Sequence, residues 1–151
     1  MKRILSAILV IFLVVTTLAG CSSTKKETEF YDLVVETQEL LEEYATDILD
    51  CWSDHVHDKK YATINLALSA AKRMNSDTIE AIEANHEIIQ SLCYKIKNGK
   101  LKAEIKNVFL AYDDYYTFVM DAGGSYNSFS EKLPEIEKVL SDALKSLKYE
   151  L

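Results

Sequence analysis

Residues that break regular backbone structure are scarce in this chain, which contains one proline and four glycines among 151 residues. Neither residue type occurs between Cys21 and Asn98. Proline and glycine are the residues that most disfavour a helix interior, so a long stretch without them excludes a loop-rich or turn-rich domain. Leucine, isoleucine, glutamate, lysine and alanine fill this stretch, and we therefore predict an all-α fold.

Sequence motifs typical of enzymes are also absent. The chain contains no Cys-x-x-Cys, no His-Glu-x-x-His, no glycine-rich phosphate loop and no nucleophile elbow. The adjacent carboxylates Asp113 and Asp114 make a poor catalytic pair, because neighbouring side chains on a helix diverge. We therefore expect a protein that is not an enzyme and that needs no cofactor.

The N-terminus has the layout of a secretory signal peptide. Met1-Lys2-Arg3 is basic, residues 4–15 are apolar except for Ser6, and smaller residues lead to Cys21. The apolar segment of about a dozen residues falls short of the roughly 20 that span a membrane as a helix. We therefore expect cleavage, and an uncleaved N-terminal anchor helix is the alternative.

Leu18-Ala19-Gly20-Cys21 resembles the lipobox of bacterial lipoprotein precursors. The resemblance implies cleavage before Cys21, acylation of this cysteine, and a location on the cell membrane facing away from the cytoplasm. One acyl chain binds a bilayer weakly, whereas the two or three chains that the resemblance implies would hold the protein durably. The expected organisation is a signal peptide over residues 1–20, a lipidated polar tether over 21–27 and a helical domain over 28–151.

The charge of the chain limits its partners. It has 17 basic and 24 acidic side chains, and loss of Lys2 and Arg3 with the signal peptide changes the net charge from −7 to −9. An acidic domain is a poor partner for nucleic acid or for an anionic lipid surface. The excess of acids suits a cationic partner, although it also serves simply to keep a surface protein soluble.

Apolar residues recur three and four positions apart through the region after Cys21, which is typical of amphipathic helices. The predicted helices cover residues 28–57, about 61–98, 101–121, and a last segment that starts between 126 and 131, where Ser130 is a candidate cap. The links are short, which favours antiparallel neighbours. We predict an up-down antiparallel four-helix bundle. An unbroken second helix would reach about 60 Å at 1.5 Å per residue, so we expect it to be bent or split near Ser76.

Cys51 and Cys93 remain once Cys21 is assigned to lipid. Outside the cytoplasm such a pair is often oxidised, but both residues also lie on apolar stripes, where a free cysteine packs as a small hydrophobe. If the second helix runs on without reversing, the two cysteines lie tens of Å apart by helical rise and cannot bond. If the chain reverses near Ser76, they can.

Two sets of residues are candidates for a functional site. The first is an aromatic surface made of Tyr112, Tyr115, Tyr116, Tyr126 and Phe129, because tyrosine combines a flat apolar body with a polar tip. The helical spacing of the tyrosines equally favours burial at the edge of the core.

The second set gathers histidines and carboxylates at the end of the first predicted helix: Asp50, Asp54, His55, His57 and Asp58. Metal-binding histidines on a helix usually stand four residues apart, and these stand two apart. We therefore expect no metal site there. His86 lies on an apolar stripe, where we expect a core histidine paired with a neighbouring polar group.

Part of the chain resembles small helical surface proteins of Gram-positive bacteria. The resemblance lies in Trp52, the tyrosine-rich run 112–116, Gly124-Ser125-Tyr126 and Ser128-Phe129-Ser130, and it implies no activity. Taken together, the sequence favours a non-enzymatic interaction module of the cell envelope that engages a protein or another envelope component. The alternative is an accessory lipoprotein that binds a small ligand or a metal for sensing or uptake.

Overall fold

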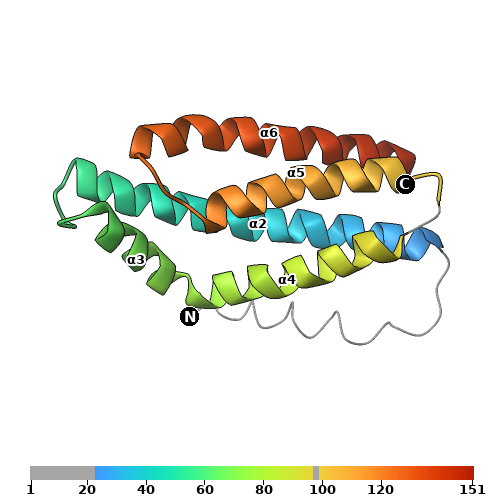
Figure 1. Cartoon of the computed structure of the whole chain (residues 1–151), viewed down its shortest axis with the longest axis horizontal. Coiled ribbons are helices and arrows are strands. Elements are labelled where there is room, and N and C mark those ends of the chain that lie inside the picture. Colours follow the sequence, from blue (N-terminus) through green and yellow to red (C-terminus); the bar gives the residue numbers. More distant parts are fainter. Residues whose placement is uncertain (1–22, 97–98) are drawn as a thin grey trace.

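The computed structural model describes residues 23–96 and 99–151, and within these ranges the chain is helical without any strand (Figure 1). The helices are α2 (Ser23–Val56), α3 (Ile64–Met74), α4 (Ser76–Lys95), α5 (Lys102–Met120) and α6 (Tyr126–Glu150). They pack antiparallel, and the prediction of an all-α fold is confirmed.

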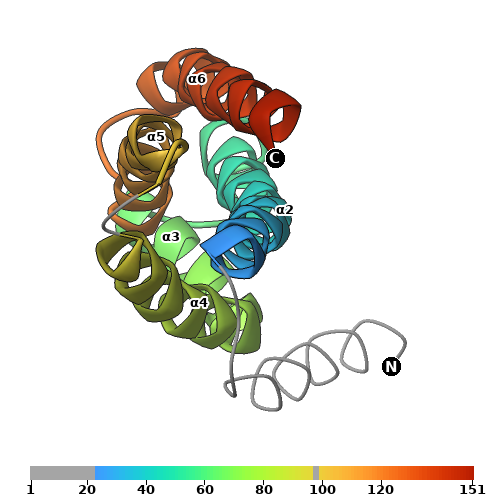
Figure 2. The same ribbon diagram turned by 90° about the vertical axis from the view of Figure 1, so that its right-hand side faces the viewer.

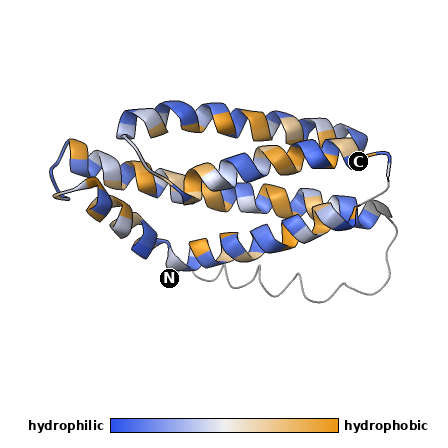
Figure 3. Ribbon diagram, viewed as in Figure 1, coloured by the Kyte–Doolittle hydropathy of each residue, from blue (hydrophilic) through white to orange (hydrophobic). Residues whose placement is uncertain are grey.

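Helix α2 is the longest helix and contacts every other described helix. Helices α3 and α4 run back along it, and α5 and α6 follow as an antiparallel pair (Figure 1). Viewed from one end, the helices surround a common interior (Figure 2). Hydrophobic and hydrophilic residues alternate along each helix (Figure 3), as expected where one face of each helix is buried.

A single residue, Asn75, separates α3 from α4. Its side-chain amide is buried and donates hydrogen bonds to Asp47 Oδ2 at 2.9 Å and to the Ala71 carbonyl at 3.0 Å. These bonds fasten the joint to α2 and satisfy a carbonyl at the end of α3. The chain bends here without reversing, and α4 continues toward the far end of the bundle (Figure 1).

One helix start and one helix cap differ from the sequence prediction. Helix α2 begins at Ser23, so residues 23–27 of the predicted tether are helical. Helix α6 begins at Tyr126 because Ser125 has an extended backbone and its hydroxyl accepts a hydrogen bond from Ser128 N at 3.2 Å. The prediction of Ser130 as the cap is therefore wrong, and its hydroxyl instead donates to the Asn127 carbonyl.

The core draws on all five described helices and extends from Phe30 to Leu147. Three aromatic rings meet where α2, α5 and α6 come together, at what we call the aromatic end: the buried Trp52 and Phe129 and the half-buried Phe118. Trp52 and Phe129 pack edge to face at 5.4 Å, and Phe118 stacks on Phe129 at 4.7 Å. All the described core lies C-terminal to Cys21, so the chain from Ser22 onward contains every residue that builds it.

Cys51 and Cys93 are both free thiols. Cys51 lies near the end of α2 and Cys93 near the end of α4, at opposite ends of the bundle (Figure 1). Because the chain bends at Asn75 without reversing, this is the topology for which we expected no disulfide between Cys51 and Cys93. Among the described helices, none combines the length and apolar character needed to cross a bilayer.

Candidate functional site

The five residues of the proposed aromatic surface lie at different depths. Tyr112 and Tyr115 are fully buried and Phe129 is 2% exposed, whereas Tyr116 and Tyr126 are half-buried. The first three are core residues and offer no surface to a partner in the folded domain. Of the expected binding surface, only Tyr116 and Tyr126 retain exposed area.

Burial of Tyr115 is accompanied by a polar link between α5 and α6. Its hydroxyl donates a hydrogen bond to Glu137 Oε1 at 3.1 Å. Burial, with a contribution from the charge of Glu137, raises the pKa of Tyr115 above its ordinary range. Burial also raises the pKa of Glu137, although the hydrogen bond from Tyr115 opposes the change. The pair joins α5 to α6.

His86 packs between tyrosine rings. Its imidazole stacks on Tyr116 with ring centroids 3.9 Å apart and lies 5.7 Å from Tyr112. Nε2 is 3.9 Å from Asp113 Oδ1, at the limit of an ion pair. Nδ1 is buried and has no hydrogen-bond partner among the described residues. The stack joins α4 to α5, which is a structural role.

The histidines at the end of α2 point to different partners. His55 Nδ1 lies 2.6 Å from the Tyr61 carbonyl, to which it donates, and the ring of His57 packs edge to face on Tyr126 at 6.1 Å. Asp54 pairs with Lys60 instead of either imidazole. Over residues 23–96 and 99–151, no three histidine, cysteine or acidic side chains gather in a way that could hold a metal ion.

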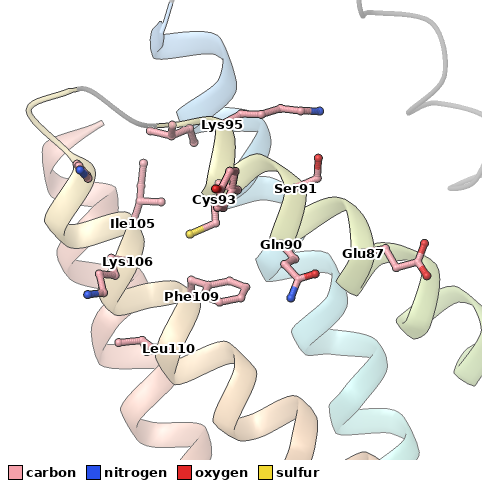
Figure 4. Close-up of a pocket in the computed structure, with 12 residues that line it drawn as sticks. Glu87, Gln90, Ser91, Cys93, Lys95, Ile105, Lys106, Phe109 and Leu110 are labelled. Carbon is pink, nitrogen blue, oxygen red and sulfur yellow. The ribbon is translucent and has the colours of Figure 1, made fainter.

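A groove lies between the C-terminal half of α4 and the N-terminal half of α5 (Figure 4). Its volume is about 840 Å³, within the range of roughly 300–1,000 Å³ found for small-molecule sites. Apolar or weakly polar side chains line it: Cys93, Tyr94, Ile96, Ile105, Phe109 and Leu110. Polar side chains complete the lining: Glu87, Gln90, Ser91, Lys95, Lys102 and Lys106.

The groove lies between two helices that pack against each other less closely than α5 and α6 do. Cys93 faces this space from α4, and Phe109 places an aromatic ring there from α5 (Figure 4). Leu110 remains 51% exposed and Tyr94 75% exposed. Apolar area is thus left accessible along this groove.

The cations of the groove have no acidic partners. No described carboxylate lies within ion-pair distance of Lys95, Lys102 or Lys106. Burial raises the pKa of the Cys93 thiol, and the charge of Lys106 partly lowers it again, so the ammonium group acts on the groove interior. In a chain with net charge −7, this is a local basic site.

The lysine end of the groove lies beside the start of the helical domain. A Cβ atom added to Gly99 would lie 3.0 Å from Glu27 Oε1, so the first turns of α2 contact the connection between α4 and α5. Sequence reasoning missed this site, although residues 95–106 contain five lysines and one glutamate. The acidic charge of the whole chain concealed this local excess.

Comparisons with models of protein families, with curated proteins and with solved structures found no match for this chain. The functional argument therefore depends on the groove and on the N-terminal sequence. Cys21 lies outside the described residues, and its acylation stays a prediction.

Proposed function

We propose that this chain is a bacterial lipoprotein, cleaved before Cys21 and anchored through acyl groups on that residue. Its helical domain would stand outside the cytoplasm as a non-enzymatic binding module. The signal-peptide layout and the sequence Leu18-Ala19-Gly20-Cys21 support the anchor. The start of α2 at Ser23 would then hold the domain close to the bilayer.

We infer an up-down four-helix bundle for this domain, in which α3 and α4 together occupy the place of the second helix. The one-residue joint at Asn75 and the continued direction of α4 support this description. The inference matters for function because it brings the end of α4, the start of α5 and the start of α2 to the same end of the molecule.

The observation that supports a binding role most directly is the groove between α4 and α5. It combines accessible apolar side chains with three lysines that have no acidic partner within residues 23–96 and 99–151. Binding sites for small molecules have this character, with an apolar lining and a few polar groups that fix orientation. A small ligand therefore fits the structure better than a partner protein bound across the tyrosine-rich helix, because Tyr112 and Tyr115 are buried.

The anchor is tested by replacing the acylated residue. We expect wild-type protein in the membrane fraction with the mass of a chain that starts at an acylated Cys21, and we expect Cys21→Ala to be uncleaved or released. Cys93→Ser is the matched control and should be processed like wild type. Wild-type protein that keeps Met1, or a Cys21→Ala variant that remains membrane-bound at the processed mass, would contradict the proposal.

A further inference from the structure

We propose that the groove between α4 and α5 binds a single-chain amphiphile, with its alkyl chain along the apolar lining and its anionic head group at the lysines. The inference deepens the proposed function by naming the class of ligand. It rests on the lipoprotein hypothesis only for the membrane as the source of that ligand, because binding itself needs no anchor.

The shape of the groove favours an extended alkyl chain. The lining runs from Glu87 to Lys95 on α4 and from Lys102 to Leu110 on α5, which is about 12 Å along each helix at 1.5 Å per residue. Phe109 lies near the Leu110 end of the α5 wall (Figure 4). A chain of this length would cover the exposed area of Leu110 and Tyr94.

The charges fix the class of head group and its direction. Lys102 and Lys106 are four residues apart and so share one face of α5, and Lys95 lies at the nearby end of α4. Glu87 lines the groove at its opposite end (Figure 4). An anionic head is therefore attracted to the lysine end and repelled from the Glu87 end, whereas a cationic head would meet the ammonium groups of Lys102 and Lys106, which have no acidic partner among the described residues.

The position of the lysine end agrees with a ligand drawn from a bilayer. This end lies against the first turns of α2, where Glu27 meets Gly99. If Cys21 is acylated, the groove opens near the membrane surface, and an amphiphile would travel a short distance from one to the other. The overall acidity of the domain does not oppose this, because the local charge at the groove is positive.

The test is isothermal titration of dodecyl phosphate, below its micelle concentration, into a chain that starts at Ser22 and so contains all the described core. We expect saturable binding at one site. Lys102→Glu/Lys106→Glu should weaken binding roughly tenfold or more. The matched control is Lys132→Glu/Lys138→Glu, which makes the same change of charge at exposed positions of α6 and should bind like wild type.

Three results of the titration would overturn the proposal. They are heat without saturation, equal affinity in the groove variant and its control, and equally strong binding of dodecyltrimethylammonium. Sedimentation of a dimer that Leu110→Asp dissociates would also overturn it, because a second copy would then fill the groove. Circular dichroism establishes that each variant is folded. Failure of this titration leaves the Cys21 experiment unaffected, so the two proposals fail separately.

Discussion

The two ends of the bundle use the same amphipathic helices and reach opposite results. At the aromatic end, Trp52, Phe118 and Phe129 fill the space between α2, α5 and α6. At the groove end, α4 and α5 pack less closely and leave a space lined by Cys93 and Phe109. The closeness of the neighbouring helices therefore distinguishes an end closed by stacked rings from an end that keeps a groove of about 840 Å³.

The largest expected effect is the loss of a ring at the aromatic end. Phe129→Ala removes the stacking on Phe118 and the edge contact with Trp52, and should lower the free energy of unfolding by about 3–5 kcal/mol. Phe109→Ala at the groove is the matched change, and it should lower stability by only about 1 kcal/mol because this ring is half-buried. Denaturation followed by far-ultraviolet circular dichroism measures both, and equal losses would remove the distinction.

Thiol reactivity gives the next contrast. Cys51 is 3% exposed near the aromatic end, whereas Cys93 is half-buried and lines the groove. We expect one alkylation of the native chain from Ser22, at Cys93, and a second at Cys51 only after denaturation. Burial raises the pKa of both thiols, so alkylation should accelerate as the pH is raised. Mass spectrometry after peptide digestion measures alkylation at both sites. Comparable alkylation rates for the two cysteines would contradict the contrast between a buried Cys51 near the aromatic end and an accessible Cys93 in the groove.

A smaller effect is expected at the joint between α3 and α4, which sets the direction of one groove wall. Asn75→Ala removes the hydrogen bonds to Asp47 and to the Ala71 carbonyl, and should lower stability by about 1–3 kcal/mol. Asn65→Ala, at an exposed position of α3, should change stability by less than about 0.5 kcal/mol. Urea denaturation of the two variants distinguishes a joint held by Asn75 from one held by packing alone.

The smallest expected effect is a change of stability with pH that depends on Glu137, which accepts the hydrogen bond from Tyr115 between α5 and α6. Burial, aided by the charge of Glu42 and opposed by the Tyr115 hydrogen bond, raises the pKa of Glu137 above its ordinary value of 4.5. The folded state therefore keeps this proton to higher pH than the unfolded chain does. The resulting contribution to stability is present below pH 4.5 and is lost as the pH rises through the folded-state pKa.

Glu137→Gln should remove this loss, because glutamine accepts the same hydrogen bond from Tyr115 and carries no charge. We therefore compare the stability of the variant with that of wild type at each pH. This difference should favour the variant slightly more above the folded-state pKa of Glu137 than it does at low pH. Glu135→Gln, at an exposed position of the same helix, is the control. Melting temperatures measured across the acid range report the difference, and parallel curves for wild type and Glu137→Gln would disprove the effect.

The features that could be predicted from sequence depend on local pattern. The three- and four-residue spacing of apolar residues predicted the helices. The excessive length of an unbroken second helix predicted the break beside Ser76. The same spacing favoured the buried positions that Tyr112 and Tyr115 occupy. These predictions succeed because each helix has to bury its apolar face against a neighbour.

The features that were missed depend on how separate segments meet. Ser125 caps α6 in place of Ser130 because its own backbone is extended, which residue type alone does not reveal. The groove was missed because it depends on how closely α4 and α5 pack across the bundle, which the sequence pattern of each helix does not reveal. Its lysines are close in sequence, but only the structure shows that they lie beside an apolar lining and so could form part of a binding site.

The central claim is that the groove end binds an anionic amphiphile, and Cys93 tests it most directly because its thiol lines the groove (Figure 4). The measurement is the rate of Cys93 alkylation in the chain from Ser22, with and without saturating dodecyl phosphate. Our account predicts a rate at least several-fold lower with dodecyl phosphate and unchanged with dodecyltrimethylammonium. An equal rate with and without dodecyl phosphate would contradict it.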